Sequence, residues 1–194
     1  MACTITKGRL VDCKDQLGGL KKVFFLNNYA SNFISAATLD TTNANEIDTI
    51  GATRGFLQYD LRQDLSSFTV NVQGDPLTGT FLYEQTLSVV LQKITVVDAA
   101  QIELLSKNRP QIAVLDNNNN VFVFGAEEGC YLTGGTITSG ATRTELTGVT
   151  LNFVANENKP YYMIAASSGD PSTDKFPFDG LSDVATNISI TAGT

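Results

Sequence analysis

Apolar and polar residues alternate strictly along two neighbouring stretches of the chain. In SFTVNV (67–72), Phe68, Val70 and Val72 fall on one side of an extended strand and polar residues fall on the other. TFLYEQTLSVVL (80–91) repeats this pattern, and the intervening QGDPLTG supplies turn residues. The pattern predicts a long antiparallel β-hairpin over about 66–91, and its polar face carries Ser67, Thr69, Asn71, Glu84, Thr86 and Ser88.

The periodicity changes after this hairpin. TVVDAAQIELLSKNRP (95–110) places apolar residues at helical spacing and ends in Lys107, Arg109 and Pro110, which predicts an α-helix over about 95–108. We expect its apolar stripe to pack against the apolar face of the hairpin; the stripe consists of Val97, Ala100, Leu104 and Leu105.

Most of the remaining pattern is typical of strands. The apolar runs IAVL and VFVFG and the alternating stretch GVTLNFVA are of strand length, and KKVFFLNNY and FLQYDL are further candidates. Residues 133–144, rich in Gly, Thr and Ser, are predicted to form a loop. The fold class is therefore mainly β, a β-sandwich or barrel-like pair of sheets with one flanking α-helix.

The chain has 194 residues, of which 42% are hydrophobic and 17% charged, and this predicts a single folded domain over 1–194. We expect an N-terminal arm at about 1–22 and a C-terminal arm or extension at about 156–194. No stretch of about 18 apolar residues predicts a membrane span. No secretory signal is recognisable at the start, so we expect synthesis in a cytoplasm.

The residue types argue against catalysis. The chain contains no histidine, which is the commonest general base and metal ligand, and its three cysteines predict reduced, buried thiols. We expect no enzymatic activity, no catalytic residue and no cofactor.

The net charge of −7 is unevenly distributed. Residues 1–22 carry five basic and two acidic side chains, whereas the remainder carries eight basic and eighteen acidic ones. An acidic body repels nucleic acid, while the basic segment suits contacts between copies of the chain or a merely solvated terminus. The candidate inter-subunit residues are Lys7, Arg9, Lys14, Lys21 and Lys22.

The stretch DNNNNVFVFGAE (116–127) partly matches a calcium-binding loop, with Asp116, Asn118, Asn120 and Glu127 at oxygen-ligand positions. However, Val121 stands where such a loop needs glycine, and apolar strands flank the stretch instead of helices. Asparagine tolerates left-handed dihedral angles, so a hairpin turn is the favoured interpretation, with no metal bound.

The order of hairpin, helix, a second hairpin ending EEGCYLTGGTITSG and the strand ELTGVTLNFVA resembles the major tail proteins, or tail tube proteins, of bacteriophages. The phrase TKGRLVDCKDQLGGLKKVFFLNNY is similar to those of phages of Bacteroidetes-type hosts. The resemblance covers about residues 6–155. It implies a virion protein that forms six-membered rings, which stack into a hollow tube, and it implies other tail proteins as further partners.

The resemblance also implies that the polar face of the hairpin lines the lumen and that double-stranded DNA passes without specific binding. Long hairpins have open edges that a ring could pair. The alternatives are a capsid-decorating protein, a tail terminator, or a carbohydrate-binding adhesion module that uses Tyr59, Tyr83, Tyr161 and Tyr162. An exposed aromatic cluster favours the adhesion module, whereas a polar hairpin with unpaired edges favours the tube.

Overall fold

The computed structural model describes all residues except 1–7, 10–15, 27–32, 63, 173 and 193–194, and the side chains of 97, 98, 185 and 186. The elements follow in the order β1 (Leu20–Leu26), α1 (Phe33–Ala36), β2 (Thr38–Leu39), β3 (Glu46–Thr49), β4 (Arg54–Asp60), β5 (Ser67–Asp75), β6 (Thr80–Gln92), α2 (Val96–Lys107), β7 (Gln111–Asp116), β8 (Val121–Phe124), β9 (Tyr131–Thr138), β10 (Gly148–Glu157), β11 (Tyr162–Ile164), α3 (Val184–Asn187) and β12 (Ile188–Ala192).

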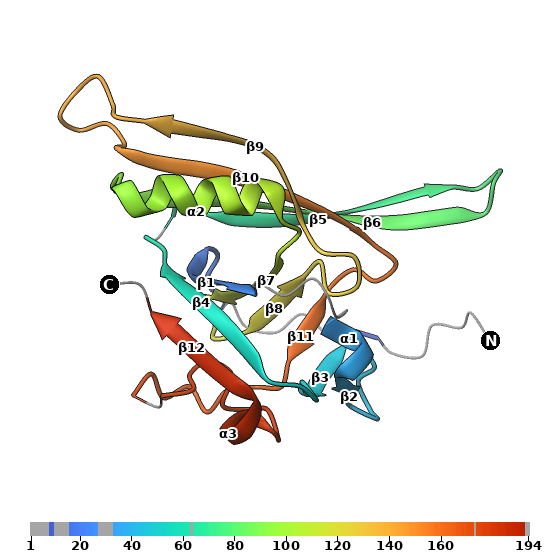
Figure 1. The fold of residues 1–194 in the computed structure, drawn as a ribbon. Helices are drawn as coiled ribbons and strands as arrows, with labels where there is room; N and C mark the ends of the chain where they lie inside the picture. The colour runs from blue at the N-terminus through green and yellow to red at the C-terminus, as the bar shows by residue number, and fades with distance from the viewer. Residues whose placement is uncertain (1–7, 10–15, 27–32, 63, 173, 193–194) are drawn as a thin grey trace.

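Two sheets form the body of the molecule (Figure 1). The larger has eight strands in the order β12-β4-β1-β7-β8-β11-β3-β2, and the smaller has four in the order β5-β6-β10-β9. Strands make up 47% of the chain and helices 10%, which confirms the predicted mainly β, sandwich-like class. The predicted hairpin is β5 and β6, and the predicted helix is α2.

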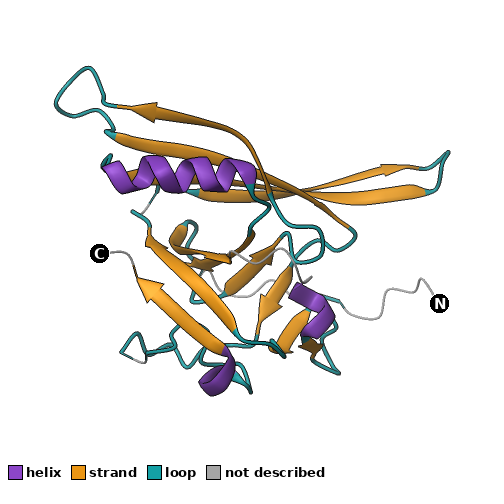
Figure 2. Cartoon of the chain, viewed as in Figure 1, coloured by secondary structure: helices purple, strands orange, loops and turns teal. Residues whose placement is uncertain are grey.

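The central strand β1 shows why the body has two apolar clusters. Its alternate side chains are buried on opposite faces: Val23 and Phe25 face the four-stranded sheet, whereas Phe24 and Leu26 face the opposite cluster. A strand covered on both faces reads as a continuous apolar run, as VFFL does. Apolar side chains therefore cover both faces of the eight-stranded sheet. The upper cluster lies between the two sheets, and the lower cluster lies on the opposite face, where the strands of the larger sheet curve around it (Figure 2).

The lower cluster depends on the C-terminal part of the chain, which the sequence pattern suggested was an arm or extension. Phe178 is fully buried, stacked on Phe56 with ring centroids 4.5 Å apart and edge-on to Phe24 at 5.0 Å. Residues 156–194 also supply β11, which lies between β8 and β3, and β12, which pairs with β4. This segment is thus integrated into the larger sheet.

Helix α2 lies beside the four-stranded sheet (Figure 1), and its buried stripe overlaps the predicted one only at Leu105 among the described side chains. Ile102 and Leu105 are partly buried against the upper cluster. The prediction for Leu104 is wrong, because its side chain is 59% exposed; Ala100 is also exposed. The side chain of Val97 lies outside the described residues. Among the helices that the structure describes, none is both long and apolar enough to cross a bilayer.

Candidate assembly surface

The outer face of the four-stranded sheet gathers the polar side chains of the predicted hairpin. Residues directly opposite each other in a ladder point to the same face. Ser67 lies opposite Ser88, Thr69 opposite Thr86, and Asn71 opposite Glu84, so all six predicted lumen candidates share one face. Strand β10 extends this face with Thr150, Asn152 and Asn156, and β9 extends it with Gly134 and Thr136.

Hydroxyl and amide groups dominate this face. Glu84 is its charged residue within the four-stranded part, and the side chain of Gln73 donates a hydrogen bond to the Glu84 carboxylate. The opposite face of the same strands is apolar and buries Leu87, Val89 and Phe153 completely or nearly so. The sheet therefore has one dry face that holds the fold together and one polar face directed away from the body.

Among the described residues, no further strand pairs with either edge of this sheet, β5 or β9. Strand β5 has nine residues and β9 has eight, and most of their side chains are exposed. Neither strand contains lysine, arginine or proline, residues that commonly protect an exposed edge from pairing. The edges of the larger sheet differ, because β2 has only two residues and β12 only five. Within the part of the chain that the structure describes, the smaller sheet thus offers two long edges without lysine, arginine or proline.

The edge strand β9 was missed in the sequence, where residues 133–144 were predicted to form a loop. Its glycines hid it, since Gly134 and Gly135 weaken a strand pattern. Gly135 is required by packing: a Cβ atom there would lie 2.8 Å from the backbone oxygen of Thr150. Strand β9 also contains a register shift opposite Asn152 and Phe153, which interrupts the alternation. The polar–apolar alternation of Thr136, Ile137 and Thr138 was the one local pattern that could have indicated this strand.

A buried carboxyl lies at the base of the hairpin. Glu157, at the end of β10 opposite Tyr83, is only 4% exposed. One of its oxygens accepts the backbone N–H groups of Glu127 and Glu128 at 3.2 and 3.1 Å. Its other oxygen has no hydrogen-bond partner among the described residues. Burial raises the pKa of this carboxyl to about 7, and the charges of Glu127 and Glu128 add to that shift against the two backbone hydrogen bonds.

Gln85 fixes the same region from β6. It is buried, its side-chain amide donates to the backbone oxygens of Lys159 and Pro160, and its side-chain oxygen accepts the backbone N–H of Gly125. Every polar atom of this amide therefore has a partner. This role could not be predicted from the sequence, because all the partners of Gln85 are backbone groups 40 or more positions away.

The calcium-like stretch is a turn between β7 and β8. The Asp116 carboxylate accepts the backbone N–H groups of Asn118 and Asn120 at 2.8 and 2.7 Å and also their side-chain amides. Asn119 adopts the left-handed conformation, with φ 63°. The Asp116 oxygens are thus engaged by N–H donors. Glu127 instead accepts the hydroxyl hydrogen of Tyr162 at 3.0 Å. Among the described residues no group of acidic, Cys or His side chains is arranged to hold a metal ion.

The predicted inter-subunit cations have mixed positions. Lys21 donates to the side chain of Asn119 at 2.9 Å, and Lys22 pairs with Asp60 at 3.4 Å, so both contact their own chain. Arg9 is exposed. Lys7 and Lys14 lie outside the described residues, as do Cys3 and Cys13. Cys130 is buried, and burial together with the charge of Glu157 raises the pKa of its thiol.

A cleft of about 490 Å³ lies between the β2–β3 loop, the β7–β8 turn and β11. Its walls combine amide side chains with an aromatic ring and a thioether; they include Asn43, Asn45, Glu46, Asn119, Tyr161 and Met163. The other tyrosines considered as a sugar platform do not join Tyr161 there: Tyr162 is buried, and Tyr59 packs edge-on against Phe25.

Comparison with protein-family models, with curated proteins and with solved structures finds no match to this chain. Function therefore has to be inferred from the geometry of the sheet, its edges and its side chains.

Proposed function

We propose that this chain is a structural virion subunit that closes into rings by pairing β5 of one copy with β9 of the next, and that these rings stack into a phage tail tube. The observation that carries the proposal is the matched pair of open edges on the four-stranded sheet. Three successive antiparallel pairings separate β5 from β9, so the two edges run in opposite directions. Edge-to-edge contact between copies then continues the antiparallel pattern around a closed ring.

The offset between the edges also suits a barrel. Followed across the ladders, β5 lies opposite residues 80–88 of β6, whereas β9 lies opposite residues 86–92. The midpoints of these spans, 84 and 89, differ by about five residues. Strands tilted by about 40° need a stagger of roughly five residues for every four strands, given the rise per residue and the strand spacing. Full-length pairing of β5 with β9 therefore produces an ordinary barrel tilt.

The polar face supports the choice of a conduit for DNA. In this ring the face that carries Thr69, Thr86 and Glu84 lines the channel, and the apolar face with its helix lies outside. The ladders place hydroxyls, amides and the carboxylates of Glu84 and Asp75 on this face, and no lysine or arginine among the described residues. Such a lining offers phosphates no cation, so DNA slides through without being held. Double-stranded DNA is then a passenger, and the binding partners are other copies and the proteins at the tube ends.

Electron microscopy with two proline variants tests this function. Successive residues of an edge strand direct their backbone N–H groups to opposite sides, so one of Thr69 and Val70 faces β6 and the other faces the open edge. The wild-type chain should form rings or hollow tubes of uniform diameter in negative stain at high concentration. Thr69→Pro and Val70→Pro should differ: one loses thermal stability, and the other stays folded but no longer assembles. Tubes from both variants, or a wild-type chain that stays monomeric at every concentration, would refute the proposal.

The amide-lined cleft favours a second candidate, a carbohydrate-binding adhesion module. Asn45 and Asn119 are each held through the side-chain oxygen by a lysine, at 3.3 and 2.9 Å, which orients their NH₂ groups as hydrogen-bond donors. Tyr161, held edge-on against Phe122 at 5.5 Å, supplies an aromatic ring at the cleft wall. Retention on a glycan array that Tyr161→Ala abolishes, from a chain that does not assemble, would favour this candidate over the tube.

A further inference from the structure

The β5–β6 hairpin continues beyond the four-stranded sheet. Strand β10 accompanies β6 only as far as the pair Glu157 and Tyr83, whereas β5 and β6 stay paired to Asp75 and Thr80. Figure 1 shows this two-stranded ribbon projecting from the body. Every residue from 71 to 82 is exposed. A two-stranded ribbon is marginally stable in water by itself, so a projecting one of this length indicates a surface that another molecule covers.

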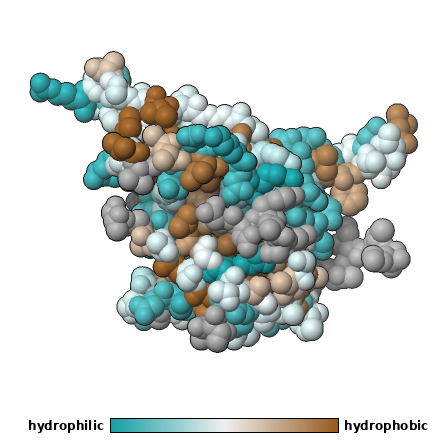
Figure 3. All heavy atoms as spheres, in the orientation of Figure 1, coloured by the Kyte–Doolittle hydropathy of each residue, from teal (hydrophilic) through white to brown (hydrophobic). Residues whose placement is uncertain are grey.

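The end of the ribbon is apolar. Leu77, in the turn, is 95% exposed, and Phe81 and Leu82 follow it in β6 with exposed side chains. Figure 3 shows apolar atoms at the end of the projection. Ring closure does not cover these side chains, because it uses the backbone edge of β5, whereas Leu77 lies in the turn and Phe81 and Leu82 lie in β6. We call residues 76–82 the hairpin tip. Large apolar side chains gathered on a projection are typical of an interaction site.

The opposite end of the same sheet carries a second apolar area. At this end β6 and β9 end and β5 begins (Figure 1). Val96, the first residue of α2, is 92% exposed. We call this area the receiving end; its exposed apolar residues are Leu65, Ile94, Val96 and Ile137.

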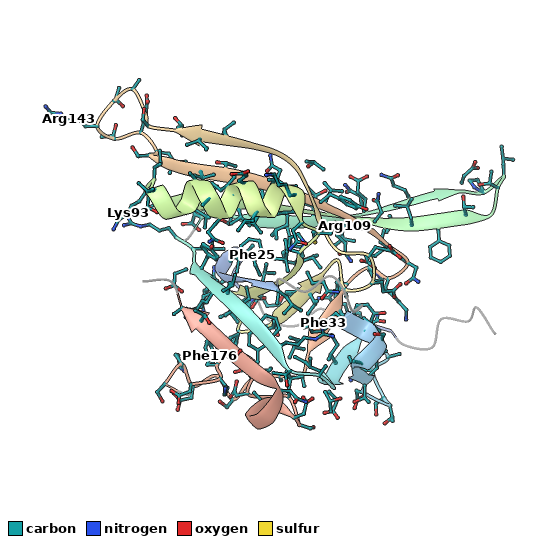
Figure 4. The ribbon with its side chains drawn as sticks, in the orientation of Figure 1. Phe25, Phe33, Lys93, Arg109, Arg143 and Phe176 are labelled. Atoms are coloured by element: carbon teal, nitrogen blue, oxygen red, sulfur yellow. The ribbon has the colours of Figure 1, made fainter. Side chains whose placement is uncertain are left out.

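The two ends also differ in charge. Lys93 and Arg143 project at the receiving end (Figure 4), where both are exposed. The carboxylate of Glu145 in the same loop accepts the backbone N–H groups of Ala141 and Thr142. The ribbon carries Asp75 just before the tip. Exposed Asp64, beside Leu65, adds a second carboxylate to the receiving end. Contact of Asp75 with Lys93 or Arg143 favours copies arranged head to tail, and repulsion between Asp75 side chains disfavours copies arranged tip to tip.

We propose that the hairpin tip of one copy docks on the receiving end of a second copy in the adjacent ring. This inference rests on the proposed function, which places all the tips at one end of the ring and all the receiving ends at the other. Because the contact joins two different surfaces of the same chain, each ring offers a fresh set of tips to the next and all rings in the stack point the same way. Apolar burial of Leu77, Phe81 and Leu82 supplies the axial attraction, and edge pairing supplies the lateral one.

Single substitutions at the two ends separate axial from lateral contacts. Leu77→Asp and Val96→Asp change nearly fully exposed side chains, so neither disturbs the core. We expect each variant to form single rings and to raise the concentration needed for tubes by at least about tenfold. Leu104→Asp is the matched control, because it also replaces an exposed leucine by aspartate but lies on α2 outside the tip and outside the receiving end, so it should leave tubes unchanged.

Mixing the two variants tests the pairing itself. A ring of Leu77→Asp keeps an intact receiving end, and a ring of Val96→Asp keeps intact tips, so a mixture contains one working junction. We expect sedimentation and negative stain to show stacks of two rings and no longer. Tubes from either variant alone, unstacked rings in the mixture, or monomers from Leu77→Asp would overturn the inference while rings from the wild-type chain uphold the proposed function. A wild-type chain without rings would overturn both.

Discussion

Replacing Glu157 by glutamine should flatten the pH dependence of stability. The Glu157 carboxyl is buried at the base of the hairpin, and burial raises its pKa from 4.5 to about 7. Because the folded state then binds the proton more tightly than the unfolded chain, the stabilisation is present below pH 4.5 and is lost as pH rises through 7. Glutamine keeps an oxygen that can accept the N–H groups of Glu127 and Glu128, but it carries no charge at any pH.

The size of the effect follows from the shift. Ionising this group in the fold costs about 3 kcal/mol once the pH is well above 7, and about 2 to 3 kcal/mol of this accumulates between pH 5 and pH 8. The wild-type chain should therefore lose that much of its free energy of unfolding across this range relative to Glu157→Gln. Glu103→Gln is the control, because this carboxylate is exposed on α2 and pairs with exposed Lys107.

Urea unfolding at pH 5, 6, 7 and 8, followed by circular dichroism, measures the difference. The protein must be dilute enough to be monomeric, since assembly would stabilise the folded state by mass action. The informative quantity is the difference between wild type and Glu157→Gln at each pH, because all other titrating groups cancel in it. If that difference does not change with pH, Glu157 is not a buried, proton-binding group.

Three further predictions concern packing, the lumen and the edge strand. Phe178→Ala should lower the free energy of unfolding by about 3 to 5 kcal/mol, because it empties a fully buried site between Phe24 and Phe56. Leu104→Ala, at an exposed position, should lower it little in the same thermal unfolding experiment. Equal losses would contradict the packing described. Glu84→Lys should leave tubes intact but make them retain linear DNA at low salt and release it at high salt. Tubes of Glu103→Lys, which adds the same charge on α2, should not retain DNA. DNA that still passes freely through Glu84→Lys tubes would show that Glu84 faces elsewhere. Gly135→Ala should displace β9 and impair assembly, because the new Cβ would lie 2.8 Å from the backbone oxygen of Thr150. Gly134→Ala should assemble normally, because no atom lies within 4 Å of its Cβ position. If Gly134→Ala impaired assembly and Gly135→Ala did not, the assigned β9 pairing would be refuted.

Local pattern predicted the parts of the fold that local forces determine. Strict alternation located β5 and β6, a change of period located α2, and the asparagine run located the turn after β7. The six polar residues of the hairpin could be assigned to one face because side chains in a strand alternate with a period of two.

Contacts between distant segments could not be predicted in this way. Phe178 lies in an irregular stretch whose burial depends on Phe24 and Phe56, more than 120 positions earlier in the sequence. The exposed position of Leu104 follows from how α2 is placed on the sheet, which helical periodicity alone does not fix. Strand β9 was hidden because its glycines serve close packing against β10, a requirement visible only when both strands are in place.

The position of β11 in the larger sheet sets an order of events during synthesis. Strands β2 and β3 leave the ribosome early, yet they join the sheet only through β11, whose residues 162–164 are made more than 110 positions later. Strand β4 likewise waits for β12 to cover its outer side. Until those late strands arrive, a nascent chain exposes additional unpaired edges, although β5, β6 and their hairpin are already complete. Chains that stop early therefore carry a finished hairpin on an unfinished body, which makes them ready partners for aggregation and substrates for proteolysis.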